Sequence, residues 1–129
     1  MTARVTIQTE DFDLSQEVAA LRAGDAGVGA VASFIGTVRD RSGAAPDTTR
    51  MALEHYPGMT EKHLERVVAE AGQRWEILDS LVIHRVGPLL PNDPIVLVAV
   101  WSSHRDAAFQ ACRYIIDELK TRASFWKQE

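Results

Sequence analysis

The sequence predicts an α+β fold with a mixed or largely antiparallel sheet and three helices. Strand-like stretches come in pairs between the helices, and a helix follows the last pair, giving the order β, α, β, β, α, β, β, α. Strand pairs of this kind disfavour a doubly wound parallel sheet, in which single strands alternate with helices. The 129 residues contain no repeat or linker, so one domain spanning residues 1–129 is expected.

The first third of the chain predicts a strand, a helix and a second strand. Apolar and polar residues alternate from Arg4 to Thr9, as in a short strand. A helix is predicted from about Leu14 to Arg22, with Asp13 or Ser15 as its cap. The apolar run from Gly27 to Val38 predicts a central strand. Its glycines indicate a bend or a close backbone approach.

A polar loop separates this strand from the next. The stretch from Arg39 to Arg50 contains glycine and proline but few apolar anchors, so the loop is expected to be mobile without a ligand. Alternation resumes from Met51 to Tyr56 and predicts a strand. Thr60 is predicted to cap a helix that runs to about Trp75, with an apolar face formed by Leu64, Val67, Val68 and Ala71.

Two more strands and a long helix complete the prediction. The strands are expected at Ile77–Val86 and Ile95–Trp101, with an irregular proline-rich turn between them. The last helix is predicted from His104-Arg105 to about Arg122. Ser102 and Ser103 can cap it, and Ser103 with Asp106 has capping-box spacing. Its core stripe is Ala108, Cys112, Ile115 and Leu119.

Composition excludes several classes of function. Apolar residues make up 46% and charged residues 25%, and the net charge of −4 argues against a nucleic-acid or anionic-membrane partner. No signal peptide or membrane-spanning run is recognised, so the cytoplasm is expected. Cys112 is interpreted as a core residue in a reducing compartment. No cofactor motif or metal-ligand spacing is present, so neither a cofactor nor a metal is predicted.

Cationic residues cluster at both ends of the last predicted helix. His104 and Arg105 stand at its start, where positive charge opposes the helix dipole unless an anion binds. Lys120, Arg122 and Lys127 stand at or beyond its end, where a favourable interaction with the dipole is the alternative explanation. Such a helix is about 28 Å long, so one small substrate can hardly touch both ends of one copy. A site that uses both ends therefore requires folding back or a second subunit.

Four stretches resemble the MoaE family, the large catalytic subunit of molybdopterin synthase: FIGTVRDR (34–41), LEHYPGMTEKHL (53–64), IHRVGPL (83–89) and SSHRDAAFQACRYIIDELKTRASFWKQE (102–129). The resemblance implies an α/β-hammerhead fold and a homodimer. It also implies that a small ubiquitin-like MoaD-type subunit docks at each end, giving a heterotetramer. The C-terminal Gly-Gly thiocarboxylate of that subunit would supply sulfur to cyclic pyranopterin monophosphate and make the dithiolene of molybdopterin.

The resemblance also implies the site residues. Lys120 and Lys127 would be catalytic, and the substrate would be bound by Phe34, Thr37, Val38, Arg39, His104, Arg105, Lys120, Lys127, Gln128 and Glu129. Guanidinium groups suit a phosphate, while cationic neighbours and an apolar flank would lower the pKa of Lys120. The single cysteine offers no sulfur relay, which fits an external donor. The alternative for Phe34 is a plain core residue.

A second function remains open for the whole chain. Members of the family usually continue beyond this segment with a tail that helps to build the neighbouring site, whereas this sequence ends at Glu129. The alternative is therefore a non-catalytic dimeric module that binds a ubiquitin-like protein tail or a phosphate ligand.

Overall fold

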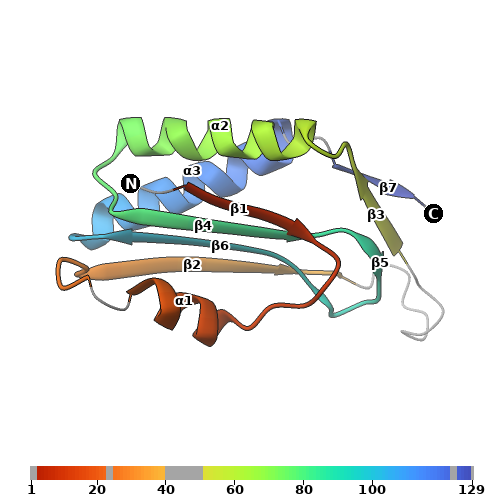
Figure 1. Cartoon of the computed structure of the whole chain (residues 1–129), viewed down its shortest axis with the longest axis horizontal. Coiled ribbons are helices and arrows are strands. Elements are labelled where there is room, and N and C mark those ends of the chain that lie inside the picture. The colour runs from red at the N-terminus through yellow and green to blue at the C-terminus, as the bar shows by residue number, and fades with distance from the viewer. Residues whose placement is uncertain (1–2, 23–24, 40–50, 123–124, 129) are drawn as a thin grey trace.

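A computed structural model describes residues 3–22, 25–39, 51–122 and 125–128 of the chain. It contains a four-stranded sheet, a smaller three-stranded sheet and three helices (Figure 1). The strands are β1 (Ala3–Gln8), β2 (Ala30–Thr37), β3 (Met51–His55), β4 (Asp79–Arg85), β5 (Gly87–Leu89), β6 (Pro94–Ser102) and β7 (Phe125–Gln128). The helices are α1 (Leu14–Arg22), α2 (Met59–Arg74) and α3 (Arg105–Arg122).

The large sheet has the strand order β1-β4-β6-β2. The β1–β4 pair is parallel, and the β4–β6 and β6–β2 pairs are antiparallel. The prediction of an α+β fold with a mixed sheet and three helices is therefore confirmed. The two central strands are rich in buried β-branched and aliphatic residues because helices cover both faces of the sheet (Figure 1).

Alternation along the strands divides the core into two layers. On one face, Val82 of β4 and Val98 of β6 pack with α2 and α3, against residues such as Leu64 and Ile115. On the other face lie the intervening residues Leu81, Ile83, Leu97, Ala99 and Trp101, against which Leu14 and Val18 of α1 pack. The predicted apolar faces of α2 and α3 thus point toward the sheet, as their helical periodicity requires.

The small sheet lies at one end of the large one and has the order β5-β3-β7, with both pairs antiparallel (Figure 1). Its core consists of Val38, Leu53 and Leu89, with Ile95 and Phe125 packed against them. The sequence-based prediction missed β5 and β7. The turn expected before β6 contains β5, where Pro88 pairs opposite Ala52 on an edge strand that tolerates proline.

The start of α2 differs from the predicted cap, and the start of α1 agrees with one of the two predicted caps. The prediction that Thr60 caps α2 is wrong, because α2 begins at Met59 after Gly58, whose φ of 85° favours glycine. The Thr60 side chain is buried and accepts a hydrogen bond from the Tyr56 N–H at 3.0 Å. In α1, Asp13 rather than Ser15 is the cap, since its carboxylate accepts the Gln16 N–H at 3.1 Å.

The start of α3 is fixed by contacts with the entry to β2. The Ser102 hydroxyl accepts the His104 N–H at 3.2 Å, while the Ser103 hydroxyl donates to the Gly27 carbonyl at 3.1 Å. The Ser103 hydroxyl is therefore bound to Gly27 and does not form the predicted capping box with Asp106. A Cβ at Gly29 would lie 2.1 Å from the Ser103 carbonyl oxygen, which confirms the predicted close backbone approach.

The loop predicted over residues 40–50 lies outside the described residues. None of the helices in the described part of the chain combines the length and the apolar character needed to cross a lipid bilayer.

Candidate functional site

Phe34 lies on the same face of β2 as Ala32, the face that packs toward α2 and α3. Its side chain is 36% exposed, so the alternative of a plain core residue is wrong. Gly36 makes room for the ring, because a Cβ there would lie 2.9 Å from Val96 Cγ1 and 3.4 Å from Phe34 Cε1. The aromatic ring is thus available at the surface where β2 approaches the small sheet.

Thr37, Val38 and Arg39 lead the chain out of β2. The β2–β6 register shifts between Gly36 and Thr37, and Val38 then turns its side chain into the small core. Backbone hydrogen bonds fix Val38: its N–H donates to the Asp93 carbonyl at 2.9 Å, and its carbonyl accepts the Asn92 N–H at 2.7 Å. Thr37 and Arg39, on either side of this anchor, are exposed.

Lys120 lies in the last turn of α3. The neighbouring Ile116 and Leu119 pack against the core, while the Lys120 side chain is exposed. It forms no hydrogen bond or ion pair with other residues that the structure describes. Lys120 therefore combines an apolar flank with an ammonium group that is free to meet a ligand.

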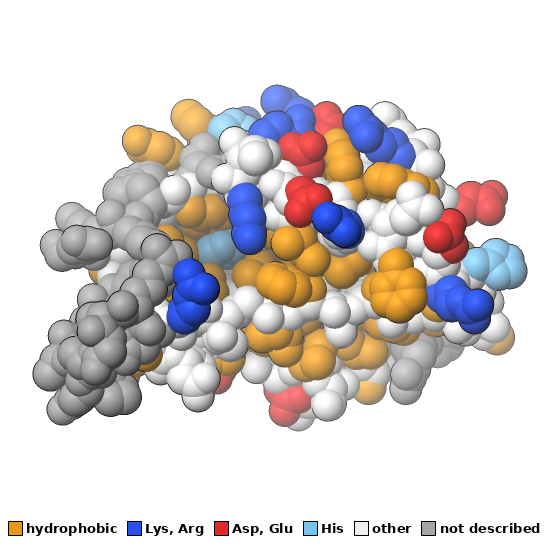
Figure 2. Space-filling view, turned by 180° about the vertical axis from the view of Figure 1, so that it is seen from behind, with side chains coloured by type: hydrophobic (Ala, Val, Ile, Leu, Met, Phe, Trp, Pro, Cys, Tyr) orange, Lys and Arg blue, Asp and Glu red, His pale blue; other side chains and the backbone are white. Residues whose placement is uncertain are grey.

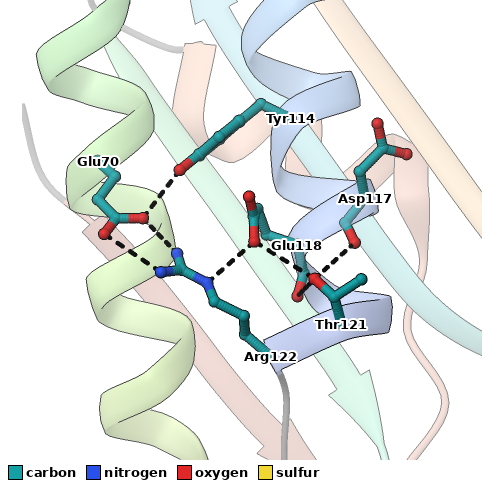
Figure 3. Close-up of polar contacts among 6 residues, drawn as sticks. All are labelled: Glu70, Tyr114, Asp117, Glu118, Thr121 and Arg122. Atoms are coloured by element: carbon teal, nitrogen blue, oxygen red, sulfur yellow. Dashed lines mark hydrogen bonds and ion pairs between the residues drawn. The ribbon is translucent and has the colours of Figure 1, made fainter.

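Arg122, by contrast, is committed to the protein's own carboxylates. Its guanidinium pairs with both oxygens of Glu70 on α2, at 3.3 Å from Nη1 to Oε2 and through Nη2 to Oε1, and its Nε lies 2.9 Å from Glu118 Oε2 (Figure 3). Tyr114 also donates its hydroxyl to Glu70 at 2.8 Å. The hydrogen bonds from Arg122 and then Tyr114 hold the pKa of Glu70 below its usual value. Arg122 thus ties the end of α3 to α2, a role that sequence reasoning missed.

The backbone of β7 carries two more predicted site residues. In the register with β3, Lys127 lies opposite Leu53 and Gln128 opposite Ala52. Phe125, at the start of β7, stacks on His84 of β4 with ring centroids 3.8 Å apart. Glu129 lies outside the described residues.

His104 and Arg105 are exposed at the first turn of α3. A pocket of about 360 Å³ opens beside His104. Its lining combines the start of α3 with the segment that enters β4: Glu76, Ile77, Leu78, Ser102, Ser103, His104 and Ala107. The predicted anion site at this helix start remains a prediction.

The structure places the predicted site residues in two groups. One group lies near the ends of β2 and α3, and the other, His104 and Arg105, lies at the start of α3. His104 directly precedes α3 and Lys120 lies in its last turn, so about 24 Å of helix separates them. In the β2–β6 register, Ala30 pairs with Ser102 near the start of α3, whereas Thr37 pairs with Pro94 at the opposite end. The predicted placement of His104 and Lys120 at opposite ends of one helix is confirmed. The inference that one small substrate can hardly touch both ends of one copy stays a prediction.

Cations and apolar groups share the exposed surface. Figure 2, which views the molecule from behind, shows Lys and Arg side chains standing around a central area of hydrophobic side chains. Large exposed hydrophobic residues of the chain include Phe34 on β2 and Phe109 on α3, the latter 64% exposed. A surface of this composition suits contact with another protein as well as with an anion.

The described residues include no group of three or more His, Cys, Asp or Glu side chains placed to hold a metal ion. Cys112 is buried on the sheet side of α3, and burial raises the pKa of its thiol to about 11. The prediction that Cys112 is a core residue is confirmed.

The chain matches known proteins over nearly its whole length. A sequence model of the MoaE protein family matches residues 7–122. The molybdopterin synthase catalytic subunit of Ralstonia nicotianae is 59% identical over 125 residues, covering 97% of this chain and 70% of that protein.

Solved structures agree with this assignment. The molybdopterin biosynthesis MoaE protein from Burkholderia ambifaria MC40-6 superimposes with a TM-score of 0.91 and 55% identity, over 99% of this chain and 83% of that one. A chain of the complex of subunits 1 and 2 of molybdopterin-converting factor from Helicobacter pylori 26695 shares the fold, with a TM-score of 0.76 and 18% identity over 97% and 82%. Close sequence identity, the matching family model and the shared architecture together show that this chain belongs to the MoaE family, the catalytic subunits of molybdopterin synthase in molybdenum cofactor biosynthesis.

Proposed function

We propose that this protein transfers sulfur from the C-terminal thiocarboxylate of a small ubiquitin-like subunit to cyclic pyranopterin monophosphate. The observation that carries the proposal is the convergence of two exposed features at one end of the sheet. Phe34 and Thr37 lie in the second half of β2, Arg39 follows its end, and Lys120 lies in the last turn of α3 beside an apolar flank. An aromatic ring, a guanidinium and an ammonium group suit a flat pterin that carries a phosphate.

In each transfer, the thiocarboxylate sulfur forms a bond to a pterin side-chain carbon as an oxygen leaves that carbon. Water then cleaves the acyl–sulfur bond and returns a carboxylate to the small subunit. Arg39 holds the phosphate, and Lys120 gives a proton to the departing oxygen. Lys127 mainly binds charge. Cys112 takes no part, because its thiol is buried and its pKa lies at about 11, so sulfur must come from outside the chain.

We further propose that the complete site uses two copies of this chain. His104 and Arg105 of one copy would approach the Lys120 end of the other, because about 24 Å of helix separates His104 from Lys120 within one copy. The small subunit would dock at each end of that homodimer, giving a heterotetramer. The pairing of exposed apolar side chains with cations supports such contacts. The proposed location is the cytoplasm, a reducing compartment in which the buried Cys112 thiol would stay unmodified.

The decisive test is the reaction itself. The protein is mixed with thiocarboxylated small subunit and cyclic pyranopterin monophosphate, and dithiolene product is followed by mass spectrometry. Product is expected with the thiocarboxylate and not with a small subunit that ends in an ordinary carboxylate. A stable complex that yields no product would favour the non-catalytic binding module.

A further inference from the structure

His84 is a buried titratable residue to which the proposed reaction gives no role. It lies at the end of β4, on the same face as Val82, and only 9% of it is exposed. Its Nδ1 is 2.9 Å from the Arg85 carbonyl oxygen. A carbonyl oxygen can only accept, so Nδ1 carries the hydrogen and the ring plane is fixed. Burial lowers the pKa of His84 to about 4, which keeps the ring neutral near pH 7.

The flat face of His84 is covered by Phe125 of β7. The two rings are 3.8 Å apart between centroids and inclined by 14°, which is a stacked arrangement. Phe125 also packs against both the large core and the core of the small sheet. His55 of β3, the backbone partner of Phe125, lies 6.4 Å from the Phe125 ring. The stack therefore joins the large sheet to the strand that carries Lys127.

Few backbone pairs hold β7 in place among the described residues. The strand has four residues and, in the part of the chain that the structure describes, pairs with β3 alone, as an edge strand of the small sheet. A slip of one residue along β3 would turn every side chain of β7 to the opposite face. Lys127 would then no longer lie opposite Leu53. A ladder this short needs side-chain packing to fix its register, and Phe125 supplies that packing.

We propose that His84 is a positioning residue for sulfur transfer. Its ring, stacked on Phe125, locks the register of β7 on β3 and so sets the place of Lys127 relative to the exposed end of β2. The hydrogen bond to Arg85 makes histidine better suited to this task than a purely apolar ring, because it orients the stacking surface. The catalytic part of this inference rests on the proposed function, but the register lock does not.

The test uses three variants of the full chain. His84→Ala removes the stack, His84→Phe keeps an aromatic ring without the hydrogen bond, and Val82→Ala is the matched control. Val82 is fully buried on the same face of β4, two residues from His84. Hydrogen exchange of residues 125–128 is measured for each variant, together with kcat and KM for the pterin in the assembled synthase.

His84→Ala is expected to speed exchange in β7 by about two- to tenfold, the range that matches the typical strength of an aromatic pair. It should lower kcat by a similar factor with little change in KM. His84→Phe should recover most of both losses. Val82→Ala should lower the unfolding temperature but leave β7 exchange and kcat close to those of the unchanged protein.

Unchanged β7 exchange in His84→Ala would overturn the proposal. An equal loss of kcat in Val82→Ala at matched stability would also overturn it, because the effect would then be general destabilisation. If His84→Ala does not fold, Phe125→Leu removes the stack from the other side and takes its place. If the unchanged protein makes no dithiolene, the proposed function fails, while the exchange data still decide whether His84 locks β7.

Discussion

Arg122 at the end of α3 binds both carboxylate oxygens of Glu70 on α2, although 52 residues separate the two in the sequence (Figure 3). The same guanidinium also contacts Glu118, so its charge is balanced within the protein. Among the cations predicted around the end of α3, Arg122 is thus a structural brace, whereas Lys120 forms no ion pair with the residues that the structure describes.

This difference predicts separate effects for two arginines. Arg122→Gln should lower the unfolding temperature but leave KM for the pterin nearly unchanged, because no substrate contact is lost. Arg39→Gln should raise KM with little effect on stability. Thermal unfolding and steady-state kinetics on both variants provide the measurement. A large rise in KM for Arg122→Gln without a loss of stability would show that Arg122 also meets the substrate.

Lys120 is predicted to transfer a proton as well as supply charge. Arginine keeps the charge but stays protonated, so Lys120→Arg should lose turnover by at least about a hundredfold. Binding of substrate and small subunit should remain nearly intact. Lys127→Arg should instead raise KM more than it lowers kcat. Should Lys120→Arg keep most of its turnover while Lys120→Ala does not, the catalytic role would pass first to Lys127.

The shared-site proposal predicts complementation between inactive subunits. A His104→Ala copy and a Lys120→Ala copy each damage a different end of α3. A heterodimer of the two retains one site with both groups intact, so some activity should return on mixing. Differently tagged copies allow the heterodimer to be purified and assayed. No recovery in verified heterodimers would exclude a site built from both ends.

Gly29 is predicted to tolerate no side chain. A Cβ there would lie 2.1 Å from the Ser103 carbonyl, and a backbone atom cannot move aside as a side chain can. Gly29→Ala should cost about 1–3 kcal/mol of stability, as overpacking usually does. Gly27→Ala is the control, because its nearest neighbour is the Asp25 carboxylate at 3.2 Å, the end of a flexible side chain. Urea unfolding of both variants tests the difference.

His84 predicts a loss of stability in mild acid. Burial lowers its pKa in the folded protein from 6.5 to about 4, so between these values the unfolded chain binds a proton that the folded chain excludes. Stability should therefore fall as pH drops from 6.5 to about 4, by about 3 kcal/mol from this residue. Urea unfolding at several pH values should show this slope, reduced in His84→Phe. Parallel slopes for both proteins would contradict the assignment to His84.

Sequence patterns correctly predicted the buried faces of the helices, because these faces depend on the spacing of nearby residues. Ala108, Cys112 and Ile115 are buried because residues three and four apart share one helix face. The short strands β5 and β7 escaped prediction, since each has at most four residues and pairs with a segment distant in the sequence. The residues that cap the helices were predicted less accurately than the residues that form the buried helix faces.

The site residues also divide into those that local spacing predicts and those that meet only in the folded chain. Charge at both ends of α3 was visible in the sequence, because a helix fixes the spacing of its own residues. The Glu70–Arg122 pair and the His84–Phe125 stack depend on tertiary contacts across 52 and 41 positions. No nearby spacing marks such contacts, so the roles of Glu70 and His84 required the folded structure.

The length of α3 has a consequence for how the chain can change. A helix turns by about 100° and rises about 1.5 Å for each residue. One added or deleted residue in the middle of α3 would rotate the Lys120 turn by about 100° relative to the start of the helix. Replacing an exposed residue such as Phe109 leaves the rotation between the two ends of the helix unchanged. Because the number of residues in α3 fixes both the distance and the rotation between its two ends, the helix should accept substitutions far more readily than insertions or deletions.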